Sequence, residues 1–227
     1  MKKTPRSSGS CGREGPERIR QRDMCCRYYL ETKEDPVWAE AAEKAEALAN
    51  KYGVKMRAAG DIAIGTATVV LAPSRLKREV IVFPMIWGFP HPKKKDILVF
   101  NTRSETAEEK DLFCTSVEDR RCAVPVTAYY EWKKGPDGKK ERVTFTPDRR
   151  CFLAGLYIRQ SGVAVPSFSI LTCEAADNIK AYHPRMPVLV PEERLSDWLN
   201  GDLPVKEAAA LCRDVKVIPG VPRTPLF

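Results

Sequence analysis

The sequence predicts one α+β domain around a mainly antiparallel β-sheet or barrel, flanked by short helices. Three observations predict this class. The 227 residues are enough for a single domain with its own hydrophobic core. Many short β-rich runs lie between turn residues, whereas helical periodicity is sustained in only one long segment. Hydrophobic residues make up 43% of the chain and charged residues 30%, which is ordinary for a soluble globular protein.

The long helix is predicted over residues 36–52. Asp35 is suited to cap its first turn, Pro36 to begin it and Gly53 to end it. Apolar residues recur at helical spacing on one face, namely Trp38, Ala42, Ala45, Leu48, Ala49 and Tyr52. We therefore expect this helix to pack against the sheet.

The strands are predicted where short β-rich runs lie between turn residues. The segment Lys134-Gly135-Pro136-Asp137-Gly138 predicts a hairpin between two of them. The predicted strands are 66–72, 79–83, 97–100, 122–132, 141–146, 151–158, 166–172, 187–190 and 214–218. Short helices are predicted at 104–113, 174–181, 192–199 and 204–212.

The N-terminal residues 1–23 contain seven Lys/Arg and three Asp/Glu and show no apolar periodicity. They are predicted to be a disordered basic extension, because they contain little to pack into a core. They are either a regulatory arm or codons upstream of the true start, and we favour the second. The domain itself is expected to span residues 24–227. Its share of the net charge of +8 allows an anionic partner without requiring one.

The sequence has no apolar run long enough to cross a bilayer, and no apolar stretch follows the N-terminal charges. A cytoplasmic location is therefore expected, with the eight cysteines as reduced thiols. No Cys-x-x-Cys pair occurs, and neither His91 nor His183 has a zinc-ligand spacing with a cysteine. Neither a metal nor another cofactor is predicted.

The segment Met24-Cys25-Cys26-Arg27-Tyr28 is the first candidate for chemistry. If translation starts at Met24, removal of that methionine leaves Cys25 with a free α-amine and a thiol on adjacent carbons. Such a 1,2-aminothiol captures an aldehyde as a Schiff base and closes it into a thiazolidine ring. An internal cysteine lacks the free amine. The plainer interpretation is that Cys25 and Cys26 only open a β-strand.

Two further candidate segments follow in the middle of the chain. Trp87, in Trp87-Gly88-Phe89-Pro90, either presents its ring to a nucleobase or packs in the core. Asn101, Arg103 and Glu105 share one side of a strand as it ends, because side chains alternate along a strand. A solvated Arg103 beside a helix cap is the alternative there.

The last two candidate segments contain groups that transfer protons. Glu131 shares a strand face with Tyr129, and a carboxylate among aromatic rings can have a raised pKa. His183 and Arg185 lie in a loop whose two prolines fix the backbone, with Thr172 upstream. Histidine is the side chain best suited to proton transfer at physiological pH. The alternatives are an exposed strand glutamate and a structural histidine.

Taken in order, these segments resemble one family, the SRAP domain, named for SOS response-associated peptidases. The resemblance extends over residues 24–227. It rests on the motifs M-C-C-R-Y, W-G-F-P, N-T-R-S-E-T, R-C-A-V-P-V-T-A-Y-Y-E-W, F-L-A-G-L-Y and H-P-R-M-P-V. Six motifs in the same order argue against an accidental match.

The resemblance implies a role in the response to DNA damage. Members of the family capture abasic sites in single-stranded DNA through a thiazolidine made by their N-terminal cysteine. The implied enzyme is an abasic site processing protein with autopeptidase or abasic-lyase-like activity, expected to act as a monomer. The implied catalytic residues are Cys25, Asn101, Glu131 and His183. The implied DNA-binding residues are Arg27, Trp87, Arg103, Thr172 and Arg185.

Four positions depart from the family pattern. Cys26 and Ala128 replace usual glycines, Ile64 stands where many members have a proline, and Pro184 replaces an acidic or amide residue. The change at Cys26 matters most, because its side chain could crowd or compete with the nucleophile. Two other functions stay open: a peptidase with Cys25 as an N-terminal nucleophile, and a noncatalytic module that binds single strands.

Overall fold

In the computed structural model of the chain, the described residues are 26–74, 79–135 and 137–220. The predicted N-terminal extension and Cys25 lie outside them. The helices are α1 (Pro36–Lys51), η2 (Ser104–Thr106), α2 (Cys114–Asp119), α3 (Asp177–Lys180), η3 (Glu192–Arg194), α4 (Leu195–Asn200) and α5 (Val205–Leu211). The strands are β1 (Arg27–Leu30), β2 (Gly60–Ala63), β3 (Ala67–Pro73), β4 (Val80–Trp87), β5 (Phe89–His91), β6 (Lys94–Val99), β7 (Asn101–Arg103), β8 (Arg121–Val126), β9 (Ala128–Lys134), β10 (Lys140–Pro147), β11 (Cys151–Ile158), β12 (Ser167–Glu174), β13 (Arg185–Pro187), β14 (Leu189–Pro191) and β15 (Val217–Gly220).

The larger sheet closes into a barrel. Its strand order is β13-β12-β4-β3-β8-β11-β14, and β7 pairs with β12 beside this path. Because β11 also pairs with β12, the strands β12, β4, β3, β8 and β11 form a closed ring. Most pairings are antiparallel, while β12 runs parallel to β4 and β7. This confirms the predicted α+β class around a mainly antiparallel barrel.

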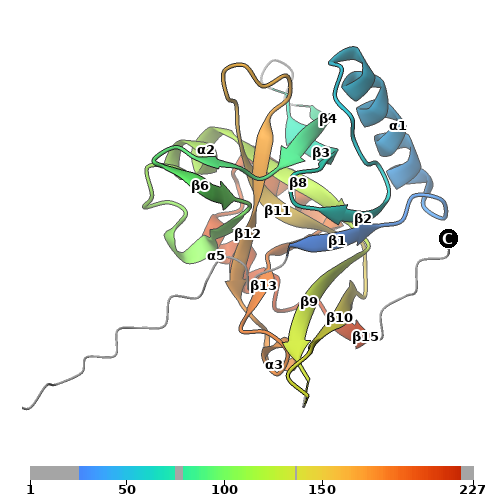
Figure 1. Ribbon diagram of the computed structural model, residues 1–227, viewed down its shortest axis with the longest axis vertical. Coiled ribbons are helices and arrows are strands. Elements are labelled where there is room, and N and C mark those ends of the chain that lie inside the picture. Colours follow the sequence, from blue (N-terminus) through green and yellow to red (C-terminus); the bar gives the residue numbers. More distant parts are fainter. Residues whose placement is uncertain (1–25, 75–78, 136, 221–227) are drawn as a thin grey trace, which may run out of the picture.

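A second, five-stranded sheet has the order β15-β10-β9-β1-β2. In Figure 1 it lies beside the barrel, with β9 and β10 extending toward one end of the molecule. The chain passes from the barrel to this sheet between β8 and β9, at Thr127. There the Thr127 amide donates to the Tyr29 carbonyl, and the Thr127 hydroxyl accepts from the Glu31 amide at 2.8 Å.

The crossing of the chain at Thr127 corrects one prediction. The run 122–132 was expected to be a single strand, but it forms β8 in the barrel and β9 in the other sheet. The β-rich run is continuous in the sequence. In the structure, however, Thr127 forms hydrogen bonds with Tyr29 of β1 and with Glu31, just after β1. Pairing with different partners on either side of Thr127 therefore ends one strand and begins the next.

The long helix forms as predicted. The Asp35 carboxylate accepts from the amides of Val37 at 3.0 Å and Trp38 at 3.3 Å, and Pro36 begins the first turn. Trp38 packs edge-on against Phe152 of β11, with ring centroids 5.1 Å apart. Figure 1 shows α1 along one side of the barrel, beside β3 and β4.

The short helices differ more from the prediction. Residues 104–113 were expected to be helical, but η2 covers only the first three, and the next helix, α2, begins at Cys114. Residues 174–181 contain the four-residue helix α3. Short segments with few periodic residues have weak intrinsic helicity, so tertiary contacts set their ends. Among the described residues, no helix is both long and apolar enough to span a membrane.

Candidate active site

The site is built around Glu131 in the middle of β9. This strand lies between β1 and β10, and Glu131 is only 2% exposed. In the β1–β9 ladder Tyr28 faces Tyr129. Continuing this antiparallel register by two residues brings Cys26 opposite Glu131, because each step forward on one strand is a step back on the other. The start of the domain therefore lies against a buried carboxylate.

The thiol of Cys26 is affected by this carboxylate. Burial raises the pKa of the Cys26 thiol, and the negative charge of Glu131 raises it further, which Arg27 and Lys140 only partly offset. A thiol with a raised pKa has little thiolate near neutral pH and is a weak nucleophile. Cys26 is thus placed at Glu131 as a neutral, half-buried group.

His183 approaches Glu131 from the loop after α3. Its Nδ1 lies 3.9 Å from Glu131 Oε1, and the two side chains are 9% and 3% exposed. This separation is too long for a direct hydrogen bond, and the two groups form an ion pair only when the imidazole is protonated. The His183 amide donates to the Ile179 carbonyl at the end of α3, which fixes the turn. A buried imidazole and a buried carboxylate are thereby brought together.

The backbone of Arg185 contacts the same Nδ1 atom of His183. Nδ1 of His183 lies 2.8 Å from the carbonyl oxygen of Arg185 and 3.1 Å from its amide nitrogen. The Arg185 guanidinium makes a bidentate pair with Glu105 at 2.6 and 2.9 Å and also donates to the Thr172 carbonyl at 2.6 Å. The Thr172 hydroxyl lies 3.2 Å from the same Nη2.

Asn101 and Arg103 reach this region through β7, which runs parallel to β12. Arg103 pairs with Thr172 in the ladder, and Asn101 pairs with Ile170. Asn101 is 5% exposed, whereas the side chain of Arg103 is exposed. Since β12 lies between β7 and β13, Asn101, Thr172 and Arg185 are carried by three neighbouring strands.

The remaining two predicted DNA-binding residues lie on β1 and β4. Arg27 begins β1 and faces Ala63 of β2, with its side chain partly exposed. Trp87 ends β4 and is fully buried: its Nε1 donates to the Phe100 carbonyl at 2.8 Å, and its ring stacks on Phe168. In this arrangement its ring has no open face for a base, and it supports the site from the core.

Two features of the site were missed by sequence reasoning. One is the contact of Glu105 with Arg185, although Glu105 was visible as a polar residue on the same strand side as Asn101. The other is the edge-to-face contact of Phe145 with Tyr182, above whose ring centroid Lys133 Nζ lies at 5.3 Å. No sequence signal joins residues that far apart in the chain.

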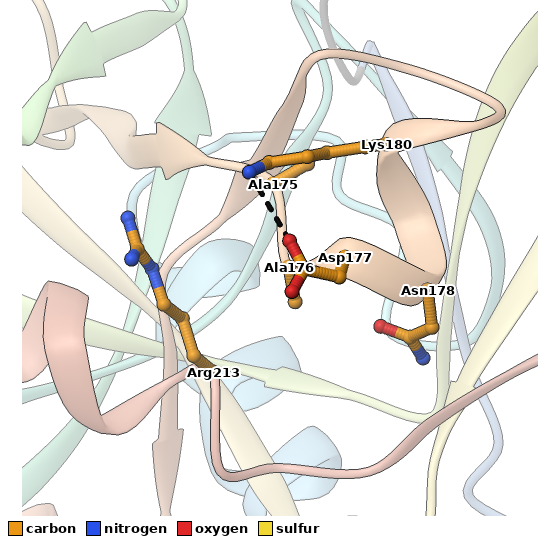
Figure 2. Close-up of a pocket in the computed structure, with 6 residues that line it drawn as sticks. All are labelled: Ala175, Ala176, Asp177, Asn178, Lys180 and Arg213. Atoms are coloured by element: carbon orange, nitrogen blue, oxygen red, sulfur yellow. Dashed lines mark ion pairs between the residues drawn. The ribbon is translucent and has the colours of Figure 1, made fainter.

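Figure 2 shows a separate pocket at the start of α3. It is lined by Ala175, Ala176, Asp177, Asn178, Lys180 and Arg213. Lys180 Nζ lies 3.2 Å from carboxylates of both Asp177 and Glu174, and Arg213 lies 3.5 Å from Glu174. The charges offset one another, so the pocket offers little net attraction to a phosphate. Of the predicted catalytic residues that the structure describes, none lines it.

Within the described part of the chain, no group of three or more His, Cys, Asp or Glu side chains is arranged to hold a metal ion. The side chains described at the site comprise two carboxylates, Glu131 and Glu105, the imidazole of His183, the amide of Asn101 and several cations.

The fold and the site together define an α+β protein with a buried acid–base pair against its first strand. A model of the family described as SOS response associated peptidase (SRAP) matches residues 24–218. The chain belongs to the SRAP family, which confirms the resemblance drawn from its motifs.

Several relatives are abasic site processing proteins by name. The chain is 32% identical over 124 residues to YoaM of Bacillus subtilis, covering 50% of this chain and 54% of that protein. It is 25% identical over 172 residues to HMCES of Xenopus tropicalis, covering 62% of this chain and 51% of that protein. The chain thus spans about half the length of the curated relatives it matches.

Solved structures share the fold. A protein from Bacteroides thetaiotaomicron superimposes with a TM-score of 0.63 at 23% identity, covering 83% of this chain and 86% of that one. A phage-related protein from Bordetella bronchiseptica gives a TM-score of 0.63 at 21% identity, covering 88% of this chain and 95% of that one. At these identities the likeness establishes the fold alone.

Proposed function

We propose that this chain, once Cys25 is its first residue, captures abasic sites in single-stranded DNA as a covalent thiazolidine. The observation that carries the proposal is the buried Glu131–His183 pair, with Cys26 against Glu131. The residue that follows Cys25 in the chain is therefore at an acid–base pair. Membership of a family whose relatives are named abasic site processing proteins supports the same function.

The reaction uses the two groups of an N-terminal cysteine. The amine adds to the C1′ aldehyde of the ring-opened sugar, the carbinolamine loses one water to give an imine, and the thiol adds to the imine carbon. An α-amine has a pKa of about 7.7–8.0, against about 10.4 for lysine, so a useful fraction is neutral at physiological pH. This difference explains why a terminal amine would be the attacking group.

The buried pair supplies the proton transfers. Glu131 gives a proton to the departing hydroxyl during dehydration and takes one back as the ring closes. His183 assists opening of the sugar by protonating O4′. Asn101 holds the amine and sugar by hydrogen bonds, without adding a charge that would perturb the amine.

The cations bind the strand without reading its sequence. Arg27, Arg103 and Arg185 attract the phosphates, with Thr172 beside Arg103 and Arg185, and phosphate contacts position DNA without specifying bases. Trp87 supports the site from the core. The proposal includes a monomeric protein that acts in the cytoplasm.

Cys26 does not compete with Cys25 in this scheme. Its raised thiol pKa leaves it protonated, and attack by its sulfur on the imine would close an eight-membered ring in place of a five-membered one. The departure from glycine at this position is thus compatible with the proposed reaction.

The test uses protein that begins at Cys25, incubated with abasic, intact and duplex DNA and analysed on denaturing gels. We expect a shifted band only with abasic single-stranded DNA. Cys25→Ala abolishes the band but keeps salt-sensitive binding, because the cations remain. Cys25→Ser, which retains the amine, gives strand cleavage without a stable adduct. An undiminished crosslink in Cys25→Ala contradicts the proposal, and binding without any crosslink favours the noncatalytic module.

A peptidase is the second candidate, favoured by the description of the family. In it, the Cys25 thiol attacks the carbonyl of the peptide bond that precedes it, which frees the α-amine and leaves the leader as a thioester, and water then hydrolyses the thioester and releases the leader. Intact mass measurement of full-length protein and its Cys25→Ala variant separates the two. A leader kept only by the variant supports self-cleavage, and loss of the leader from both excludes it.

A further inference from the structure

We propose that Glu105 is a positioning residue that fixes the His183 imidazole through Arg185. The assignment deepens the proposed function and rests on it for its effect on reaction rate, but the geometry stands on its own. Glu105 lies in η2, on the segment that follows β7, and reaches across to β13. No motif or comparison assigns it a role.

The first step is the contact of Glu105 with the Arg185 guanidinium. Two parallel N–H···O contacts, Nη1 to Oε1 at 2.6 Å and Nη2 to Oε2 at 2.9 Å, form a fork against the carboxylate. Such bidentate pairs fix the plane of the guanidinium as well as its position. The Arg185 side chain is 12% exposed and that of Glu105 is 48% exposed. Glu105 is therefore the more solvent-exposed partner of the pair.

The second step is that most of the N–H donors of this guanidinium are held within the protein. Of its five N–H groups, two bind Glu105 and one binds Thr172. The Nε group is buried and has no hydrogen-bond partner among the described residues. Most of the donors are thus directed into the protein, so the side chain joins η2, β12 and β13.

The third step runs from Arg185 to His183. Both backbone groups of Arg185 lie at Nδ1 of the imidazole, the carbonyl at 2.8 Å and the amide at 3.1 Å. Since both contacts come from the backbone of this one residue, the place of Arg185 sets the orientation of the ring in either tautomer. Since the same Nδ1 lies 3.9 Å from Glu131, a movement of Arg185 changes the geometry of the acid–base pair.

The first experiment observes His183 directly. The chain has only two histidines, so a long-range proton–nitrogen NMR spectrum resolves His183 beside His91. His91 lies on β5, where its Nδ1 accepts a hydrogen bond from the backbone amide of Lys93, and it serves as an internal control. Glu105→Gln is expected to shift the ring nitrogens of His183 and to leave those of His91 unchanged. Unchanged His183 resonances overturn the inference, even for protein that never meets DNA.

The matched control is Glu109→Gln. It removes one negative charge from an exposed side chain four residues after Glu105. It is expected to leave both histidines unchanged. If it shifts His183 as much as Glu105→Gln does, charge alone is responsible and the positioning role is wrong. Glu105→Asp keeps the charge but shortens the reach, so it is expected to shift His183 by less. It also serves as the test variant if Glu105→Gln does not fold.

The second experiment separates positioning from DNA binding. With protein that begins at Cys25, crosslinking rates are measured over a range of abasic DNA concentrations. Glu105→Gln is expected to lower the maximal rate by about tenfold or more, with the half-saturating DNA concentration equal or lower, because general acid–base groups contribute roughly 10²–10⁴-fold. An equal or higher maximal rate with tighter binding shows that Glu105 only competes with phosphate for Arg185, which overturns the inference.

The two experiments fail separately. If the wild-type protein forms no crosslink at all, the proposed function is wrong while the NMR result still decides the role of Glu105. If the wild type crosslinks and Glu105→Gln behaves like Glu109→Gln in both experiments, the proposed function stands and the positioning role is wrong.

Discussion

Strands β3, β8, β11 and β12 of the closed barrel are buried along almost their whole length, whereas β9 and β10 of the five-stranded sheet run from buried to exposed residues. The buried polar groups of the barrel include small hydroxyls such as Thr68, Ser169 and Thr172. The barrel also buries the cation Arg121, whose guanidinium donates to the backbone carbonyls of Val117 and Leu203, whereas the five-stranded sheet buries a carboxylate, Glu131.

This contrast has a physical basis. A hydroxyl is satisfied by one nearby partner, as in the 2.7 Å contact between Thr102 and Ser169, so it costs little to bury. A carboxylate costs much more to remove from water unless charges or donors compensate it. Glu131 therefore lies close to His183. Glu131 is on β9 of the five-stranded sheet, and His183 directly precedes β13 of the larger sheet. The carboxylate of the site thus lies on the five-stranded sheet, whereas Asn101, Thr172 and Arg185 are carried by strands of the larger sheet.

The sharpest test of this division is Glu131→Gln. The amide keeps the shape of the side chain but cannot exchange a proton, so we expect the crosslinking rate to fall by roughly 10²–10⁴-fold. The free energy of unfolding, measured by urea titration, is expected to change far less. A variant that loses stability but crosslinks at the wild-type rate would show that Glu131 has a structural role and no role in the reaction.

The converse test is Trp87→Ala in the barrel. Removing a fully buried tryptophan that stacks on Phe168 is expected to cost about 3–5 kcal/mol of unfolding free energy. Trp132→Ala, in the half-exposed part of β9, is the control and is expected to cost less. Equal losses in urea unfolding would remove the distinction between the two sheets. Trp87→Phe replaces Trp87→Ala if the latter does not fold.

The smallest effect concerns acid stability at the edge of the site. Burial raises the pKa of the Glu105 carboxyl, but the hydrogen bonds and charge of Arg185 outweigh it, so the pKa is lowered overall. A lowered folded-state pKa gives stability that is present above the unfolded value of about 4.3 and is lost as the pH falls through the folded value.

Because Glu105 is half exposed, solvent screening limits this contribution to less than about 1 kcal/mol. The stability difference between wild type and Glu105→Gln is therefore expected to be larger at pH 7 than near pH 3. Urea unfolding at the two pH values measures it. A difference that does not change with pH contradicts the ionic account of the Glu105–Arg185 pair.

Local signals were enough for several parts of the molecule. The cap by Asp35, the proline at position 36 and the apolar spacing predicted α1 correctly, because these interactions join residues a few positions apart. The order of the motifs predicted the family. Alternation in β9 also placed Glu131 on the same face as Tyr129, although whether that face is buried could not be read from the strand alone.

Other parts depend on contacts between distant segments. The end of β8 at Thr127 is set by its bonds to Tyr29 and Glu31, the latter 96 residues earlier in the chain. The partners of Arg185 come from η2 and β12, and the burial of Trp87 comes from packing against Tyr28 and Phe168. Pairwise contacts of this kind leave no periodic trace in a single sequence.

The sequence by itself determined the α+β class, the long helix, the family and the identities of the candidate residues, since composition, periodicity and motifs are properties of the chain. Only the tertiary structure decided that Glu131 is buried, that His183 meets it at 3.9 Å and that Arg185 is held by Glu105. The physical reason is that the environment of a charged group is set by what packs around it, and here that packing joins β1, β9, η2 and the loop after α3.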